Sequence, residues 1–441
     1  MKRFFISVGL AAAGTAGLHA AYTPDGGDNS KLWVVSATLR GFYDDNYTTA
    51  HTGAKSSLGA EVSPQFSVNL PFSQTEIGMR YTYGLYYYQE RENLGQNPID
   101  QTHQFDLWLD HAFNARWSTK VQDSFVVGQE PELVQGGAEQ RVEGNNIANT
   151  FGISLDTDWT RLFSTSVGYH NSFYDYQSHG DGVPLDEENN PSLAGMLNRV
   201  EQTANIDFQW HVKPTTVAFF GYQYGQNLYL GNEYIAPQTS VFRLDPPNPP
   251  ILVRTVPART SSDRDSLSHY GYVGVNHTFQ ENLSGTLKVG VQYSDNYADP
   301  LPSTSLGPYL DTSLIYTFAP GSYAQVGATY SRTASATIAL DPKNGTVVED
   351  QGTAALYGSV NYQVTSKLMA SALAHFQYGT YNGGSVNGQS DELYDLGLNL
   401  NYAFTRHFSA EAGYNFDYYT SAVPLQSYTR DRFYLGLTAS Y

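Results

Sequence analysis

The sequence predicts an all-β fold, a closed antiparallel transmembrane β-barrel of about eighteen strands, with about sixteen as the alternative count. Three observations predict it: apolar residues alternate with small or polar ones along most of the chain, short connections alternate with long ones, and aromatic residues are abundant (35 Tyr, 22 Phe and 5 Trp). The 441 residues include no Cys and only 15% charged residues, which excludes a disulfide scaffold, a coiled coil and a disordered chain.

The N-terminus is typical of a signal peptide. Lys2 and Arg3 precede a short apolar run rich in Gly and Ala, and Leu18-His19-Ala20 places a small residue before the expected cleavage site. We therefore expect residues 1–20 to be a cleaved signal peptide and residues 21–441 to form a single outer-membrane barrel domain.

The predicted strands have one apolar and one polar face. Along residues 283–294, Leu, Gly, Leu, Val, Val and Tyr at the odd positions alternate with Ser, Thr, Lys, Gly, Gln and Ser at the even positions. Residues 58–70, 77–85 and 394–404 repeat this pattern. A period of two residues is that of a β-strand whose two faces meet different surroundings.

The connections between the predicted strands alternate in length. Eight short connections are expected at residues 69–74, 113–117, 156–161, 211–215, 279–283, 318–322, 364–368 and 404–408. Nine longer connections, polar and rich in Gly and Pro, are expected at residues 44–56, 89–101, 129–144, 177–197, 231–266, 295–304, 332–351, 379–391 and 421–429. Short periplasmic turns and long extracellular loops are typical of outer-membrane barrels.

A sheet in a membrane must close on itself, because unpaired backbone groups in hydrocarbon cost several kcal/mol each. Its outer face must be apolar against lipid and its inner face polar, and tyrosine suits the interface because its ring is apolar and its hydroxyl is polar. A secreted, soluble all-β protein such as a propeller or sandwich also shows alternation. The regular alternation of connection lengths favours the barrel, and therefore the outer membrane of a bacterium with two membranes.

The last predicted strand ends at an aromatic residue. Phe433, Leu435, Leu437 and Tyr441 share its apolar face, and polar or small residues lie between them. This pattern resembles the C-terminal assembly signal of outer-membrane barrels, which more often ends in Phe. The resemblance implies that periplasmic chaperones and the barrel-assembly machinery are partners during biogenesis.

The predicted first strand runs into a polar loop through the sequence Ser-Ala-Thr-Leu-Arg-Gly-Phe-Tyr-Asp-Asp-Asn at residues 36–46. This opening, together with the repeated tyrosine-rich hairpins, resembles the putative beta-barrel porin type 2 family of outer-membrane proteins. The resemblance implies a barrel fold and, for some members, a link to exopolysaccharide export.

The inward positions of the predicted strands carry the candidate functional residues. Assigning faces by alternation gives these candidate pore-lining residues: Arg40, Glu61, Arg80, Asp106, Lys120, Glu201, Asp207, Lys288, Asp311, Glu411 and Asp417, together with Glu76, Asp110 and Asp395. Acid predominates among them. Asp123 falls on the outward face, where a carboxylate is costly, so we expect a bulge or a shifted register in that strand.

Asp44, Asp45 and Asn46 form a weak candidate calcium site, because loop oxygens are the ligands that Ca²⁺ prefers. The alternative is that Asp and Asn simply start a turn there. Asp45 and His111 are predicted at opposite rims of the barrel, too far apart for acid–base catalysis. The sequence also has no nucleophile elbow, metal-ligand histidine pair or phosphate loop, so we expect no enzymatic activity and no cofactor.

The longest expected connection, 231–266, contains Pro246-Pro247-Asn248-Pro249-Pro250, a semi-rigid polyproline segment. It either folds into the lumen as a constriction or stands outside. With a net charge of −18, no nucleic-acid partner is expected. We predict a channel for passive diffusion of small hydrophilic solutes with a weak preference for cations. The alternative is a surface adhesion or exopolysaccharide-handling barrel, in which glycans bind the loops and the lumen.

Overall fold

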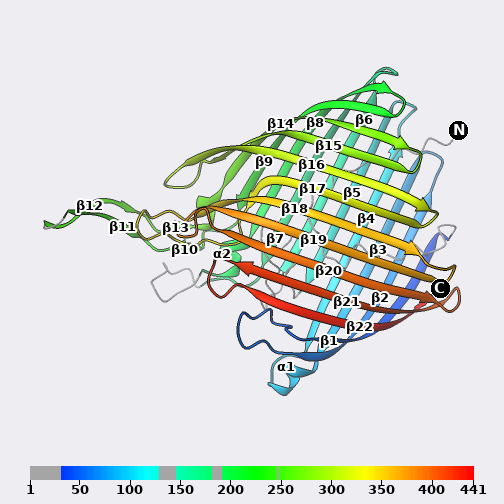
Figure 1. Cartoon of the computed structure of the whole chain (residues 1–441), viewed down its shortest axis with the longest axis horizontal. Coiled ribbons are helices and arrows are strands. Elements are labelled where there is room, and N and C mark those ends of the chain that lie inside the picture. The colour runs from blue at the N-terminus through cyan, green and yellow to red at the C-terminus, as the bar shows by residue number, and fades with distance from the viewer. Residues whose placement is uncertain (1–30, 129–145, 181–190, 246–247) are drawn as a thin grey trace.

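The computed structural model describes residues 31–128, 146–180, 191–245 and 248–441, and these residues form a closed antiparallel barrel of 18 strands (Figure 1). The predicted fold class and strand count are confirmed. The predicted signal peptide, residues 1–20, lies outside the described residues. The barrel strands are β1 (Trp33–Asp44), β2 (Ser57–Pro71), β3 (Thr75–Tyr88), β4 (Ile99–Ala112), β5 (Trp117–Gly128), β6 (Asn146–Asp158), β7 (Phe163–Tyr176), β8 (Arg199–Lys213), β9 (Thr216–Tyr229), β14 (Ser266–Gln280), β15 (Leu283–Asn296), β16 (Ser303–Ala319), β17 (Ser322–Ala334), β18 (Val348–Gln363), β19 (Leu368–Gly383), β20 (Ser390–Ala403), β21 (Phe408–Ser421) and β22 (Tyr428–Ser440).

The barrel closes where its first and last strands pair. β1 and β22 are antiparallel in unbroken register from Ser36↔Ser440 to Asp44↔Arg432. The backbone amide of Tyr441 also donates to the carbonyl of Val35 at 2.8 Å. The first strand is thereby paired with the last, as a sheet in hydrocarbon requires.

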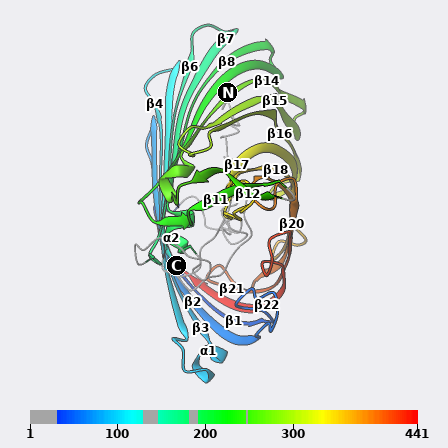
Figure 2. The same cartoon turned by 90° about the vertical axis from the view of Figure 1, so that its left-hand side faces the viewer.

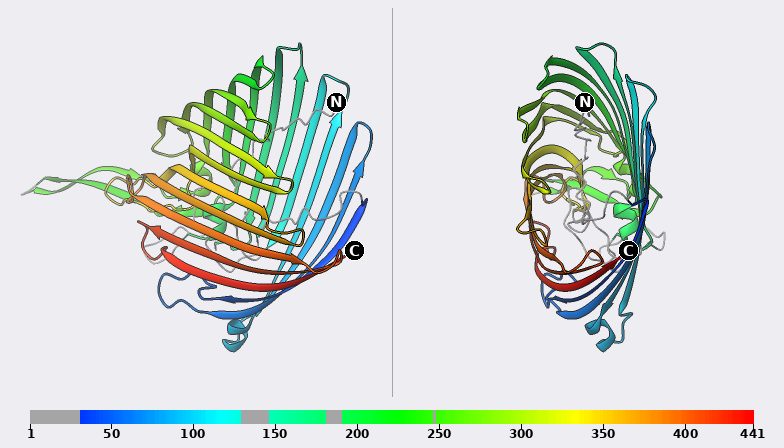
Figure 3. Two further views of the ribbon diagram at one scale, coloured as in Figure 1. Left: turned by 45° about the vertical axis from the view of Figure 1, so that its right-hand side comes forward. Right: turned by 90° about the vertical axis from the view of Figure 1, so that its right-hand side faces the viewer.

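All eight predicted tight turns lie at one end of the barrel, which we call the turn end, and eight of the longer connections have described residues at the other, the loop end. The predicted connection 129–144 lies outside the described residues. Figure 2 looks onto the loop end, and the right-hand view of Figure 3 looks onto the turn end, beside which the C-terminus lies. The shortest connections between barrel strands are residues 214–215, 281–282 and 320–321, all at the turn end. The predicted alternation of connection lengths is therefore confirmed.

The outer surface of the barrel is apolar and its inner surface is polar. Leu39, Val62 and Leu435 are among many exposed apolar side chains on the outside, whereas the buried side chains are largely polar or charged. Aromatic pairs mark both rims: Trp117 and Trp159 at the turn end have ring centroids 5.6 Å apart. The members of the predicted assembly signal, Phe433, Leu435, Leu437 and Tyr441, are all exposed on the outer face.

Asp123 faces outward as predicted, but the expected bulge or shifted register is wrong. β5 pairs with β4 and with β6 without any register shift, and Asp123 lies opposite Leu107 and Phe151. Asn149 on β6 donates from Nδ2 to the Asp123 carboxylate at 3.0 Å. This hydrogen bond partly compensates a carboxylate on the lipid-facing surface, so the strand needs no irregularity to hide it.

The connection between β9 and β14 builds a ribbon outside the barrel. β10 (Tyr234–Ala236) pairs with β13 (Arg259–Thr260), and β11 (Thr239–Asp245) pairs with β12 (Asn248–Val256). The β11–β12 hairpin projects away from the loop end (Figure 1). Of the two alternatives for the loop 231–266, the structure therefore favours the external one for this hairpin. Pro246 and Pro247 lie outside the described residues.

Within the described residues, helical structure is limited to α1 (Gln89–Asn93), α2 (Leu193–Leu197) and the 3-10 turn η1 (Ser261–Arg264). Over the described ranges, no helix is long and apolar enough to cross a membrane. Near α2, three loops pack together at the loop end. Ile235 and Ala236 from one loop form an apolar cluster with Ile338 and Val347 from another, and Met196 of α2 packs against it.

Candidate functional site: the lumen wall and a pocket at its loop end

A charge cluster crosses the seam where the barrel closes. Arg40 on β1 lies opposite Glu61 on β2, with Nη1 to Oε1 at 3.0 Å, and its Nε also donates to Glu411 on β21 at 2.5 Å. Gly436 on β22 lies between Arg40 and Glu411 in the register. A Cβ at this glycine would lie 2.8 Å from Arg40 Cγ and 2.7 Å from Glu411 Oε1, so only glycine leaves room for the arginine to cross β22.

A second cluster crosses the same seam nearer the loop end. Arg430 on β22 pairs with Asp44 on β1 at 2.8 Å and with Asp417 on β21 at 3.4 Å. Each cluster joins one guanidinium to two carboxylates and so has an excess of one negative charge when all three groups are ionised.

The oxygens of the candidate calcium group have partners within the protein. Asp44 accepts from Arg430 and from the backbone amide of Asn46, and Asp45 accepts from the backbone amide of Asp431 at 2.7 Å. The Asn46 side chain bonds the backbone of Ala50. Across the described part of the chain, no group of three His, Cys, Asp or Glu residues could hold a metal ion. This geometry favours the turn-forming alternative and ties the first loop to β22.

Two other rows of predicted pore-lining residues lie on neighbouring strands. Arg80 on β3 pairs with Asp106 on β4 at 2.8 Å, and Ser124 on β5 donates to the same carboxylate at 2.8 Å. Lys120 lies directly opposite Asp110 in the β4–β5 register. In these rows basic residues face acidic ones, so they carry no large net charge of either sign.

Lys288 lies in a cage of tyrosine rings. Its Nζ lies 3.7 Å from the ring centroid of Tyr272 and 5.3 Å from that of Tyr309. Lys288 is only 2% exposed, and within the described residues its Nζ has no hydrogen-bond partner. Asp311 lies opposite it in the β15–β16 register, and Asp207 lies on β8, three strands away beyond β14 and β9. Cation–π contacts therefore hold this ammonium in place of a close ion pair.

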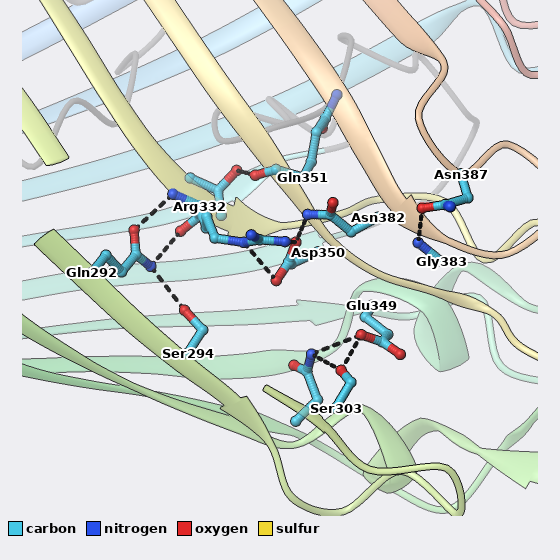
Figure 4. A network of polar contacts seen from close by, with 12 residues as sticks. Gln292, Ser294, Ser303, Arg332, Glu349, Asp350, Gln351, Asn382, Gly383 and Asn387 are labelled. Carbon is cyan, nitrogen blue, oxygen red and sulfur yellow. Dashed lines mark hydrogen bonds and ion pairs between the residues drawn. The ribbon is translucent and has the colours of Figure 1, made fainter. Parts of the chain in front are cut away.

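The barrel wall opens at the loop end between β16 and β17. Their pairing runs from the turn end only as far as Leu310↔Tyr330. Beyond it, the lumen-facing side chain of Gln292 on β15 binds the backbone of Arg332 on β17, accepting from its amide at 2.7 Å and donating to its carbonyl at 3.0 Å (Figure 4). Because Gln292 faces the lumen, this end of β17 lies on the lumen side of β15.

Two groups of polar contacts lie beside this displaced strand end (Figure 4). The guanidinium of Arg332 donates to both carboxylate oxygens of Asp350 on β18, with the shortest contact at 2.9 Å. Glu349 accepts from Asn296 Nδ2 at 3.0 Å and from the Ser303 hydroxyl. Neutral donors alone therefore bind the Glu349 carboxylate, and no ion pair to it occurs among the described residues.

A small pocket with a cavity volume of about 20 Å³ lies between this displaced strand end and the barrel wall. It is lined by Asn227, Tyr229, Arg264, Ser266, Ser268, Ser294, Asn296, Arg332, Thr333, Ala334, Glu349 and Asp350. Such a volume holds about one or two water molecules, so only a small polar group fits inside.

Arg264 brings an uncompensated positive charge to the pocket. It is 5% exposed, donates to the carbonyls of Met196 at 2.9 Å and Ser335 at 2.5 Å, and stacks 4.4 Å from the Tyr229 ring. Its Nε has no partner, and no carboxylate pairs with it among the residues that the structure describes. Burial lowers the pKa of this guanidinium from its ordinary value, as expected where no anion offsets the loss of water.

Sequence patterns placed part of this site and missed the rest. Glu201, predicted to line the pore, pairs with Arg199 at 2.7 Å near the pocket. Arg332, Glu349 and Asp350 fell in the expected connection 332–351, and Arg264 in the expected connection 231–266. Alternation gives no signal there, because the packing of loops against the wall sets their positions.

The acid–base pair considered for catalysis is divided between the two ends of the barrel, as predicted. Asp44 ends β1 at the loop end, whereas His111 lies beside the tight turn that follows β4 and contacts Phe113 with ring centroids 4.6 Å apart. His111 Nδ1 is 2.8 Å from the Thr75 hydroxyl. These residues are therefore too far apart to share a proton.

Several solved barrels resemble this chain in overall arrangement. OccAB4 from Acinetobacter baumannii is 13% identical, with 93% of this chain and 99% of that one covered and a TM-score of 0.42. The outer membrane protein OpdK from Pseudomonas aeruginosa is 9% identical over 93% and 99%, with a TM-score of 0.41. A mutant of the ferric enterobactin receptor PfeA from Pseudomonas aeruginosa is 10% identical over 92% and 80%, with a TM-score of 0.43. Likenesses this weak bear on neither substrate nor mechanism.

Comparison by sequence gives one family match, to the C-terminal part of the chain. No curated protein matches the chain, but residues 253–441, from within β12 to the C-terminus, match the family described as putative beta-barrel porin 2. The opening motif at residues 36–46 lies outside the matched range, so the match is independent of it. Residues 253–441, less than half of the chain, thus match the putative beta-barrel porin 2 family, the one its sequence resembles, and this match supports a porin-like barrel of the outer membrane.

Proposed function

We propose that this barrel is a channel for passive diffusion of small hydrophilic solutes, with a weak preference for cations. The observation that carries the proposal is the seam of the lumen wall, where Arg40 and Arg430 are each outnumbered by two carboxylates. A barrel of this many strands is wide enough for an aqueous channel. Fixed negative charge on its wall attracts cations and repels anions.

The preference for cations should be modest at physiological salt. The Debye length there is about 8 Å, so solutes near the axis of a wide pore are largely screened from charges on the wall. Lowering the salt concentration lengthens this distance and should strengthen the preference. Arg80 and Arg332 are each neutralised by a carboxylate and should contribute little.

The cellular context follows from the same proposal. An N-terminal signal peptide would direct export, and periplasmic chaperones and the barrel-assembly machinery would deliver the strands to outer-membrane lipid. The projecting ribbon β11–β12 and the other long connections would face the cell exterior, and the tight turns would face the periplasm.

Planar bilayers test the channel and its selectivity together. We expect the reconstituted protein to conduct, and its reversal potential across a potassium chloride gradient to show a preference for K⁺ that grows as salt is lowered. The double substitution Glu61→Gln and Glu411→Gln leaves Arg40 uncompensated and should shift the reversal potential toward chloride. Glu281→Gln, in an exposed turn between β14 and β15, is the matched control and should change nothing.

Two outcomes would contradict the proposal. A chloride preference in the unsubstituted protein that grows as salt falls would show that basic residues control the pore. A folded, heat-modifiable protein that does not conduct would favour the alternative, an adhesion or exopolysaccharide-handling barrel.

A further inference from the structure

The pocket at the loop end holds two opposite charges that the protein does not neutralise. Arg264 contributes a buried guanidinium without a carboxylate partner, and Glu349 contributes a carboxylate that only Asn296 and Ser303 bind. The other two charges of the lining, Arg332 and Asp350, neutralise each other. The lining as a whole is neutral, yet one group of each sign is left to interact with something else.

Desolvated charges without a counter-charge are costly, and a ligand that brings both missing charges offsets that cost. A carboxylate suits the guanidinium, because charge-assisted hydrogen bonds between these groups are short and strong. An ammonium suits the carboxylate of Glu349 for the same reason. A neutral polyol offers only weaker hydrogen bonds to Arg264 and Glu349. A simple anion compensates Arg264 alone, and a simple cation compensates Glu349 alone.

The remaining lining fits a small polar head. The hydroxyls of Ser266, Ser268 and Thr333 and the amide of Asn227 supply neutral donors and acceptors around the two charges. The enclosed space, about 20 Å³, takes only one or two atoms of such a head, so its other atoms and the rest of the solute must lie outside the cavity, toward the lumen.

We propose that this pocket is a binding site for the α-amino-carboxylate group of zwitterionic solutes, that is, of free amino acids. Arg264 takes the carboxylate, Glu349 takes the ammonium, and the side chain of the solute points into the lumen. This inference rests on the proposed channel function and specifies the class of solute. Free amino acids of this kind have no net charge, so a weakly charged lumen does not repel them.

Isothermal titration of the detergent-solubilised full-length barrel tests the site without requiring conduction. L-alanine is the probe, and propionate, ethylamine and glucose each offer part of its chemistry. We expect binding of L-alanine and at least about tenfold weaker binding of the three partial analogues, because each loses a charge-assisted contact. Equal or tighter binding of glucose would show a polyol site and overturn the proposal. Absence of L-alanine binding to the folded protein would also overturn it.

Substitutions locate the site. Glu349→Gln retains the shape of the side chain and removes its charge, and should raise the dissociation constant for L-alanine at least about tenfold. Arg264→Lys keeps a positive charge but loses the planar fork, and should weaken binding to a smaller extent. Glu281→Gln should bind as the unsubstituted protein does. Unchanged affinity in Glu349→Gln would place L-alanine elsewhere and overturn the assignment.

Conductance separates this inference from the proposed function. If the barrel conducts potassium chloride but does not bind L-alanine, the proposed channel function stands and the proposed binding site is wrong. If the barrel binds L-alanine with the expected dependence on Glu349 but does not conduct, the proposed binding site stands and the proposed channel function is wrong.

Discussion

The seam between β22 and β1 and the opening between β16 and β17 are two solutions to the same strand-pairing problem. At the seam the register is unbroken, Arg40 and Arg430 each pair with two carboxylates, and Arg432 lies 4.4 Å from the Phe42 ring. At the opening the pairing stops at Leu310↔Tyr330, and a side chain, Gln292, replaces the missing strand contacts. The charges of Arg40 and Arg430 at the seam are compensated within the protein, whereas at the opening Arg264 and Glu349 have no counter-charge among the described residues.

The difference indicates how a barrel separates stability from recognition. A closed ladder with paired charges resists change, because every backbone group and every buried charge depends on its neighbour. A wall that opens at one point loses several backbone hydrogen bonds but gains a pocket whose walls come from both strands and loops. We therefore expect substitutions at the seam to affect assembly and stability, and substitutions at the loop end to affect binding.

The largest effect should come from the end of the seam. Deleting Tyr441, or replacing it with Asp, should strongly reduce folded protein in the outer membrane while export across the inner membrane continues. Deletion removes two backbone hydrogen bonds to Val35, and either change removes the ring contacts with Trp33 and His407. The measurement is heat-modifiable gel migration of membrane-extracted protein.

Tyr297→Asp is the matched control, because this tyrosine is exposed in a connection at the loop end. It should assemble normally. If both Tyr441 variants reached the level of this control, the terminal strand would not be the assembly signal that its sequence resembles.

A smaller effect is expected from one glycine at the seam. Gly436→Ala places a Cβ 2.8 Å from Arg40 Cγ and should lower the free energy of unfolding by about 1–3 kcal/mol, the usual cost of overpacking. Gly41→Ala on the neighbouring strand meets no atom within 4 Å and should be neutral or slightly stabilising. Urea unfolding in detergent measures both. Equal losses in the two variants would mean that strand flexibility, and not the crossing of Arg40, explains Gly436.

The seam was predictable from sequence, and the opening was not. Alternation placed Arg40, Glu61 and Glu411 on one face, and closure of an antiparallel barrel then requires the first and last strands to meet. The role of Gly436 could not be seen in the sequence, since it depends on the Arg40 side chain of the neighbouring strand crossing β22 to reach Glu411. The eight tight turns were found because short polar connections between apolar strand ends leave few conformations.

The pocket could not be predicted from sequence, because the contacts that form it follow no periodic pattern of residues along the chain. Gln292 belongs to a strand that was predicted with the right face, but its partner is the backbone of a residue assigned to a loop. Arg264 is fixed by carbonyls of Met196 and Ser335, far apart in sequence. Asp123 shows the opposite case: its outward face was predicted, but the need for a bulge was inferred without knowing that Asn149 would bind it.

The smallest effect should be a pH dependence confined to the loop end. Burial raises the pKa of Glu233, but hydrogen bonds from Ser192, the amide of Gly180 and His179 outweigh it, so the pKa lies below its ordinary value of 4.5. A carboxylate with a depressed pKa stabilises the folded form above pH 4.5, and that contribution is lost as pH falls through the folded-state pKa. The two loops that Glu233 joins should therefore loosen in acid.

Hydrogen exchange of the amides at residues 192–196, followed from pH 6 to about pH 3 and corrected for intrinsic rates, measures this loosening. We expect protection to fall at the acid end in the unsubstituted protein and to be low and independent of pH in Glu233→Gln. The change should be small, because the carboxylate is partly solvated and salt screens it. Amides of β22 at the seam are the internal reference, because their protection depends on the whole ladder. A fall in protection at β22 as large as that at residues 192–196 would mean that acid loosens the entire barrel, and the contrast between a rigid seam and an adaptable loop end would then be lost.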